Sequence, residues 1–213
     1  MKKLQILVCA LLLGSVSVNA QKKKNHKSST KPKVEFGIRA GANISKINGD
    51  DYSYIFSSKI GYFGGLVVKY PLSKTLSLQG EAYYNMIGSK AKNQPALDPF
   101  RVNSKIAYVS VPILFQFKIS PEFYLETGPE IGVNLSSKNK NIDTGEVFIM
   151  KDTKRITFFW GIGTGYYLTE NIAANFRANI GMNSPFFKTV NAEGTSDHFR
   201  MNNFQLGLVY YFK

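Results

Sequence analysis

Residues 204–212 read FQLGLVYYF, a stretch in which large apolar residues fall at every second position. The apolar set is Phe204, Leu206, Leu208, Tyr210 and Phe212, and the residues between are Gln205, Gly207, Val209 and Tyr211. A period of two is typical of a β-strand with one face in an apolar environment. The stretch therefore predicts a strand, and the fold depends on what its apolar face meets.

The same period of two recurs from Val34 to the end of the chain. It marks eight segments, at 34–45, about 59–70, 76–86, 107–118, 123–134, about 154–167, 172–182 and 204–212. Short links (71–74, 120–121 and 169–171) alternate with long polar ones (about 47–58, 89–103, 136–152 and 184–197). This alternation is typical of outer-membrane barrels, which have tight periplasmic turns and longer outside loops. We therefore expect an all-β fold, an eight-stranded antiparallel up-and-down transmembrane β-barrel with both termini on the periplasmic side.

A soluble lipocalin-like barrel also alternates, so two further features decide which set faces outward. Mid-strand positions of the polar set carry charges of both signs, at Glu35, Arg39, Glu81, Lys118, Glu126, Glu130 and Arg177. Aromatic residues of the apolar set gather beside the short turns or the chain end, at Phe36, Tyr70, Phe117, Phe123, Tyr166, Tyr210 and Phe212. Aromatic rings at one level are typical of a membrane interface. We expect the apolar set to face lipid and the charged set to pair inside the barrel.

The N-terminal segment differs in composition from the rest. Residues 1–20 combine a basic start, an apolar run of about ten residues and a small-x-small end, which predicts a secretory signal peptide. Residues 21–33 (QKKKNHKSSTKPK) hold six lysines and predict a disordered basic periplasmic tail, so the barrel domain is 34–213. The one cysteine, Cys9, lies in the signal peptide, and this excludes disulfide and thiol chemistry from the mature chain.

Several stretches of the mature chain resemble one family. They are FGIRAGANIS (36–45), AYVSVPILFQFKIS (107–120), FYLETGPEIG (123–132) and WGIGTGYYL (160–168). On these residues the chain is similar to the small outer-membrane β-barrel proteins of Bacteroidota, often labelled porin-family proteins. The resemblance covers about 34–213 and implies the barrel fold, but it implies neither a pore nor a particular activity.

The end of the chain also resembles the C-terminal signal that the outer-membrane assembly machinery recognises. Gln205, Gly207, Tyr210 and Phe212 match its polar, glycine and aromatic positions. Lys213 departs from the pattern, because most such chains stop at the aromatic residue. The resemblance implies that the assembly machinery is a partner of this chain.

Candidate chemistry is sparse. The glycines of GIGTG (161–165) precede no helix, so we interpret them as small inward residues that relieve crowding, rather than as a phosphate-binding loop. Asp50–Asp51, Asp197–His198 and Ser196 lie in long links and leave an outer-membrane enzyme, lipid A-modifying or protease-like, as the alternative function. The carboxylates are better explained as a packed plug, because an eight-stranded barrel is just wide enough for its side chains.

We therefore expect no catalytic, cofactor or metal site. The expected function is that of an integral outer-membrane protein with a structural or surface-interaction role through its four long loops. Narrow passive conductance stays open, and a soluble lipocalin-like carrier is the weaker alternative. The expected partners are outer-membrane lipid, the assembly machinery and an extracellular ligand or protein that the sequence does not identify, but no nucleic acid.

Overall fold

The computed structural model describes residues 33–49, 56–91, 102–150, 153–185 and 199–212. The predicted signal peptide and all of the basic tail except Lys33 lie outside these ranges. No helix with the length and hydropathy needed to cross a bilayer occurs in the ranges above. The strands are β1 (Glu35–Gly49), β2 (Phe56–Pro71), β3 (Leu76–Ala91), β4 (Val102–Lys118), β5 (Phe123–Asn141), β6 (Val147–Ile149), β7 (Ile156–Tyr167), β8 (Ile172–Gly181) and β9 (Phe199–Phe212).

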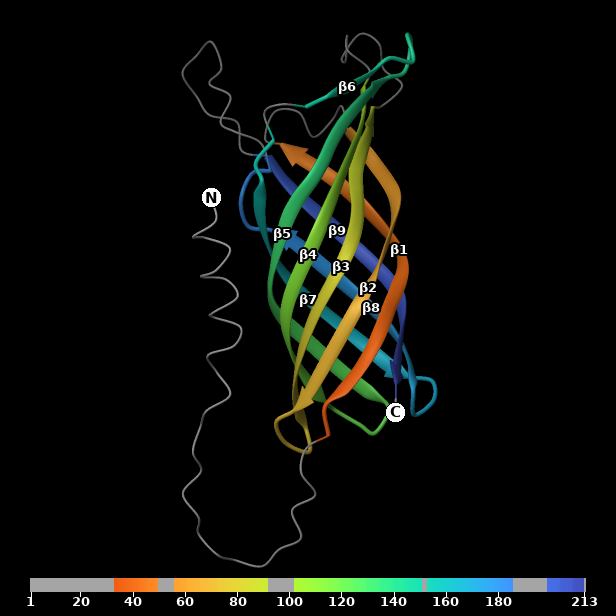
Figure 1. Cartoon of the computed structure of the whole chain (residues 1–213), viewed down its shortest axis with the longest axis vertical. Coiled ribbons are helices and arrows are strands. Elements are labelled where there is room, and N and C mark those ends of the chain that lie inside the picture. Colours follow the sequence, from red (N-terminus) through yellow and green to blue (C-terminus); the bar gives the residue numbers. More distant parts are fainter. Residues whose placement is uncertain (1–32, 50–55, 92–101, 151–152, 186–198, 213) are drawn as a thin grey trace, which may run out of the picture. The chain divides into compact units, whose positions relative to one another are not determined.

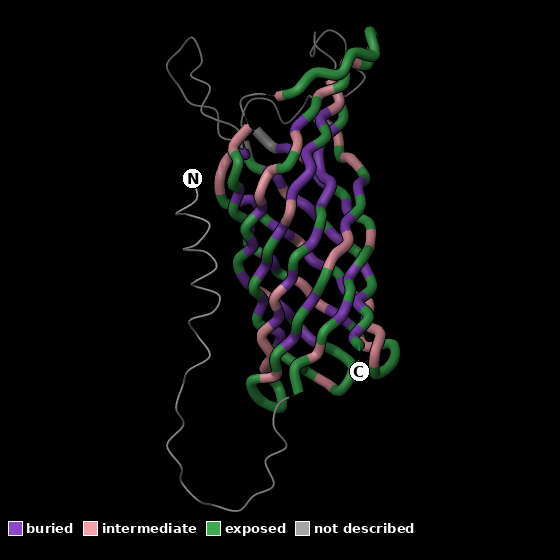
Figure 2. The backbone as a smooth tube through the Cα atoms, in the orientation of Figure 1, coloured by how far each residue is buried: buried purple, intermediate pink, exposed green. Residues whose placement is uncertain are grey.

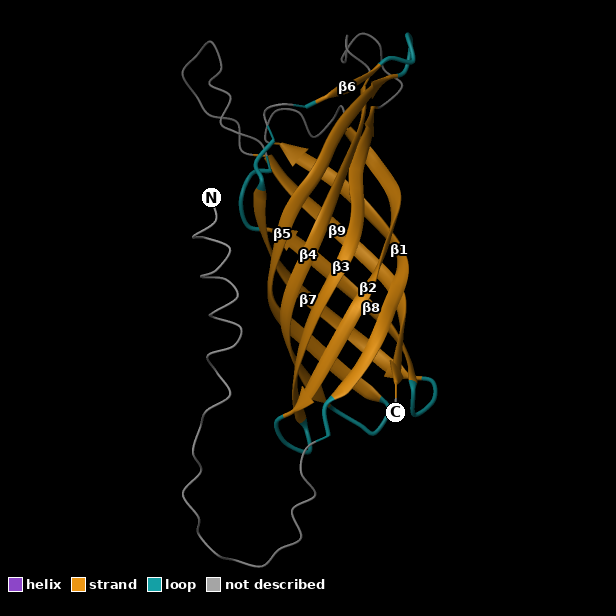
Figure 3. Ribbon diagram, in the orientation of Figure 1, coloured by secondary structure: helices purple, strands orange, loops and turns teal. Residues whose placement is uncertain are grey.

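Eight of these strands close into an antiparallel barrel, as Figures 1 and 3 show. Each strand of the wall pairs with the next along the chain, with β5 pairing directly with β7. The wall closes between β1 and β9, in a register that runs from Phe36 opposite Phe212 to Gly49 opposite Phe199. The short strand β6 pairs only with the end of β5 and stands outside the wall. The predicted eight-stranded barrel is confirmed.

Buried and exposed residues alternate along each strand of the wall (Figure 2). Large apolar side chains point outward, for example Leu66, Ile113 and Leu206, which are 65%, 51% and 65% exposed. Polar and charged side chains point inward, for example Arg39 and Arg177, which are at most 1% exposed. A soluble carrier needs the opposite arrangement, so the lipocalin-like alternative is wrong. An apolar exterior on a wall without an open edge is the arrangement that a bilayer requires.

Three short turns connect strands at one end of the barrel, which we call the turn end. In each turn a hydroxyl oxygen accepts a hydrogen bond from the backbone N–H three residues later, and this closes the turn. The pairs are Ser73 with Leu76, Ser120 with Phe123, and Thr169 with Ile172. The expected aromatic belt lies beside these turns and the end of β9, with each of its seven members exposed.

The opposite end, which we call the long-loop end, is more ordered than the sequence predicts. The expected loop 136–152 is wrong in part, because β5 continues to Asn141 and folds back through a turn into β6. A bulge that adds Leu135 to β5 offsets its register against β4 at this point. Beyond the apolar band neither strand face needs apolar residues, so the polar composition hides this hairpin. The central parts of the other three loops lie outside the described residues.

Candidate functional site

The middle of the barrel holds a cluster of buried charges. Arg177 of β8 donates to both oxygens of Glu81 on β3, at 2.6 and 2.9 Å, and to Oε1 of Glu126 on β5, at 2.7 Å. Arg39 of β1 donates to Oε2 of Glu81 at 3.3 Å. These four side chains come from four strands and are at most 1% exposed. Two positive and two negative charges therefore balance within this group, which we call the central charge cluster.

Neutral amides complete the cluster. Gln205 of β9 accepts from Nη1 and Nη2 of Arg39 at 3.0 Å each, and Asn175 accepts from Nε at 3.2 Å. Gln79 donates to Glu81 at 2.7 Å, and Gln116 donates to Glu126 at 3.0 Å. The buried guanidinium and carboxylate groups are thus held by hydrogen bonds from across the barrel. Such a network fills the middle of the barrel and engages the carboxylates of both Glu81 and Glu126.

The other three predicted charges lie elsewhere. Glu130 is buried, but it accepts from the Tyr83 hydroxyl at 2.7 Å rather than from an arginine. Glu35 forms an ion pair with Lys69 at the turn end. Lys118 is exposed and lines the cavity at the turn end, so it does not belong to the buried charge network in which the sequence placed it. It is the last residue of β4, beyond the packed interior, where its ammonium group remains hydrated.

Lys69, which the sequence analysis missed, belongs to an aromatic layer just inside the turn end. Its ammonium group donates to the Tyr167 hydroxyl at 2.7 Å and lies 4.3 Å from the centre of the Tyr211 ring. The Tyr124 and Tyr167 rings lie 5.5 Å apart, which completes the layer. Lys69 alternates with Val68 and Tyr70 of the apolar set, and this parity was the signal for an inward position. A polar cavity of about 540 Å³ lies between this layer and the turns.

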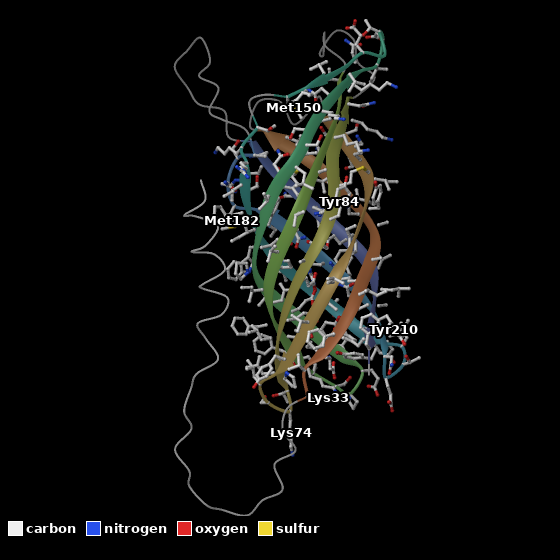
Figure 4. The ribbon with its side chains drawn as sticks, viewed as in Figure 1. Lys33, Lys74, Tyr84, Met150, Met182 and Tyr210 are labelled. Atoms are coloured by element: carbon white, nitrogen blue, oxygen red, sulfur yellow. The ribbon has the colours of Figure 1, made fainter. Side chains whose placement is uncertain are left out.

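An apolar layer fills the interior at the long-loop end, and the sequence analysis missed it as well. Its ring pair, Tyr108 and Phe159, meets edge to face with centroids 6.2 Å apart. Met150, labelled in Figure 4, packs against this layer from the segment after β6. These residues occupy the inward parity that the sequence assigned to polar groups. The buried members are Ile47, Ile87, Ile106, Tyr108, Phe159 and Met201.

The glycines of GIGTG lie where the structure needs small residues. A Cβ on Gly163 would lie 2.9 Å from Oε1 of Glu126, and a Cβ on Gly165 would lie 2.1 Å from Cζ of Tyr124. Both glycines therefore make room for large side chains of the neighbouring strand β5. The interpretation of this motif as relief of crowding agrees with the geometry.

The four residues of the predicted assembly signal occupy two faces of β9. Gln205 and Gly207 point inward, Gln205 to Arg39 and Gly207 to Phe63, whose Cζ would lie 2.7 Å from an added Cβ. Tyr210 and Phe212 point outward at the turn end, with ring centroids 5.6 Å apart. Figure 4 shows Tyr210 near this end. Recognition by the assembly machinery remains a prediction, because each of these residues also has a structural role.

Other candidate chemistry finds no support in the described residues. They contain no group of three or more histidine, cysteine or acidic residues that could hold a metal ion. The pairs Asp50–Asp51 and Asp197–His198, together with Ser196, lie outside the described residues. The buried carboxylates are engaged by arginine, amide or phenol groups, as described above.

Comparisons with known proteins agree with the barrel. The family model described as outer membrane protein beta-barrel domain matches residues 19–186. No curated protein sequence matches the chain. Among solved structures, the neisserial surface protein NspA is similar, with a TM-score of 0.56 and 14% identity over 83% of this chain and 97% of that chain.

The attachment invasion locus protein Ail of Yersinia pestis is also similar. In complex with the heparin analogue sucrose octasulfate, it gives a TM-score of 0.51 and 16% identity over 84% of this chain and 99% of that chain. Another structure of Ail gives a TM-score of 0.50 and 15% identity, over 84% of this chain and 98% of that chain. At these identities the similarity shows a shared fold alone.

Proposed function

The chain belongs to the outer membrane protein beta-barrel domain family, and from this premise we propose that it is a non-conducting, non-catalytic surface protein of the outer membrane. It interacts with partners outside the cell through the long-loop end, and both termini lie on the periplasmic side. The observation that carries this proposal is the filled interior. The matched motifs also support an origin in Bacteroidota.

Three layers obstruct the interior in succession. The apolar layer lies at the long-loop end, the central charge cluster in the middle, and the aromatic layer around Lys69 at the turn end. The residues that build them are almost all less than 10% exposed. A water-filled channel needs a wider barrel, of about 16 strands. This packing supports the proposal that neither solutes nor substrates reach the buried carboxylates.

The long-loop end is the part of the barrel available to partners. There the turn after β5 presents β6, whose residues Val147, Phe148 and Ile149 are 60%, 45% and 70% exposed. Exposed apolar side chains on a short edge strand are typical of interaction sites. The names of the similar proteins, a surface protein and an attachment invasion locus protein, support a surface role.

Conductance separates this proposal from a channel. The purified protein in a planar bilayer should give no single-channel steps over long recordings, because all three layers obstruct the path. A 16-stranded porin added to the same bilayer provides the positive control. Reproducible steps from this protein would overturn the non-conducting assignment.

Site-specific crosslinking tests the surface role and the orientation. A photoreactive residue at Phe148 should capture an extracellular protein or glycan on intact cells, whereas one at Leu72 should not. The two positions are matched, since Phe148 is 45% and Leu72 48% exposed, at opposite ends of the barrel. Adducts with extracellular material at Leu72 alone would reverse the orientation, and none at either position would remove the surface role.

A further inference from the structure

Four lysines share the outer face of the wall at its long-loop end. Lys105 of β4 lies directly opposite Lys138 of β5, and Lys140 lies opposite Asn103. Ser89 of β3 pairs with Ser104, which places Lys90 beside Asn103 on the same face. All four side chains are exposed. We call Lys90, Lys105, Lys138 and Lys140 the outer lysine grid.

The charges of the grid are not neutralised by the part of the chain that the structure describes. None of the four ammonium groups forms an ion pair there. Lys59 adds a further cation nearby, because its ammonium group donates to the carbonyl oxygen of Ser104 at 2.8 Å. Like charges directly opposite each other in a sheet are destabilising. The pairing of Lys105 with Lys138 therefore opposes folding unless an anion lies between them.

The height of the grid corresponds to a membrane interface. Between Phe117 of the aromatic belt and Lys105 there are about 12 residues of β4, or roughly 40 Å at about 3.3 Å per residue. At a strand tilt of about 40° this is about 30 Å along the barrel axis, just beyond an apolar band of about 25 Å. The exposed apolar run of β5 likewise ends at Leu135, three residues before Lys138. The ammonium groups thus lie at the level of the lipid head groups.

Apolar residues adjoin the grid on the same face. Ile149 of β6 pairs with Lys138, and Val147 pairs with Lys140. Directly paired residues of a sheet point to the same side. The face therefore combines several cations with apolar contacts, next to the lipid-facing wall. This combination suits an amphiphile that carries an anionic head group.

We propose that the outer lysine grid binds the phosphate groups of phosphorylated glycolipids in the outer leaflet. Phosphate oxygens bridge Lys105 and Lys138 and relieve their repulsion, while the acyl chains lie along the apolar wall below. The location favours a lipid over a soluble polyanion, because the grid faces sideways into the membrane rather than away from it. The proposal depends on the membrane placement of the barrel. It uses the face of β6 that holds Val147 and Ile149, whereas Phe148 lies on the opposite face.

Competitive lipid retention tests this site. The full-length protein is placed in phosphatidylcholine nanodiscs that contain equal amounts of monophosphorylated lipid A and the same glycolipid without its phosphate. Lipids retained after transfer to detergent are counted by native mass spectrometry. Each lysine near an anionic head group contributes about fivefold to binding. We expect the wild-type protein to prefer the phosphorylated lipid by on the order of tenfold or more.

Two variants define the outcome. The quadruple variant Lys90→Gln, Lys105→Gln, Lys138→Gln and Lys140→Gln should lose the preference, whereas Lys74→Gln with Lys118→Gln, at exposed turn-end sites, should keep it. Heat-modifiable migration on gels verifies that both variants are folded. Equal retention of the two lipids by the wild-type protein, or a preference that survives in the quadruple variant, overturns the proposal. Displacement of the lipid by equimolar inorganic phosphate would identify a soluble-anion site instead and overturn the lipid assignment.

Discussion

Neutralising Glu81 tests whether the central charge cluster stabilises the barrel. Glu81 accepts from Arg177 at 2.6 and 2.9 Å, from Arg39 at 3.3 Å and from Gln79 at 2.7 Å, with its side chain 1% exposed. In Glu81→Gln the shape of the side chain is kept, but one amide oxygen replaces two charged acceptors. Its NH₂ group must also face an arginine, which offers only donors. Two buried guanidinium charges would then be balanced by one carboxylate of the cluster, Glu126, which is paired with Arg177.

The expected loss follows from the burial of the pair. Removing one partner of a buried ion pair costs about 3–5 kcal/mol, because the other charge remains in a low-dielectric site. The double variant Glu81→Gln with Arg39→Gln restores the balance and leaves Arg177 paired with Glu126 at 2.7 Å. We expect this variant to lose only about 1–2 kcal/mol, for the hydrogen bonds from Arg39 to Asn175 and Gln205.

Urea unfolding in lipid vesicles gives the measurement. Trp160 is the one tryptophan of the chain and is 42% exposed on the outer face of β7, so its fluorescence reports transfer out of lipid. With a slope of about 2 kcal/mol per molar urea, Glu81→Gln should lower the midpoint by about 1.5–2.5 M. If the single variant does not fold, the folded fraction on gels should recover in the double variant. An unchanged midpoint, or a double variant no better than the single one, would refute the argument.

Two further substitutions test the packing and the chain end. Gly165→Ala should cost about 1–3 kcal/mol in the same assay, because the new Cβ would lie 2.1 Å from Tyr124. The control Gly64→Ala, whose Cβ meets nothing within 3.8 Å, should change stability by less than about 0.5 kcal/mol, and equal effects would contradict the crowding argument. Phe212→Asp should strongly reduce outer-membrane levels in cell fractions, whereas Phe212→Tyr should not. A charge near the interface costs only about 0–1 kcal/mol, so a strong loss would reflect failed assembly rather than lost stability. Normal levels of Phe212→Asp would count against an assembly signal.

Much of the barrel could be predicted because one period and one alternation of link lengths constrain it together. Parity placed Arg39, Glu81 and Arg177 inside, and only a closed barrel brings residues so distant in sequence together. Parity could not identify the partner of each charge, since that depends on the stagger between strands. That Arg177 pairs with both Glu81 and Glu126, whereas Glu130 accepts from the Tyr83 hydroxyl, was therefore visible only in the structure.

Two physical causes explain why the sequence did not predict the positions of some residues. Inward positions at the long-loop end hold apolar groups such as Ile106 and Met201. The alternation assigns inward positions to polar residues, so it gave no sign that apolar side chains fill the barrel there. Beyond the membrane both faces of a strand meet water, so the alternation that identifies strands disappears there. The extension of β5 and its pairing with β6 had no apolar pattern to reveal them. Lys118 failed for a related reason, because the last residue of a strand lies beyond the packed interior.

The interior and the outer wall use charge in opposite ways. Inside, Arg39 and Arg177 are balanced by Glu81 and Glu126, so these charges act on one another and on the fold. Outside, Lys105 and Lys138 face each other with no acidic partner among the described residues, an arrangement that weakens the sheet. Stability alone therefore explains the buried charges and fails to explain the exposed ones. An anionic lipid at that height accounts for both the position of the lysines and their mutual proximity.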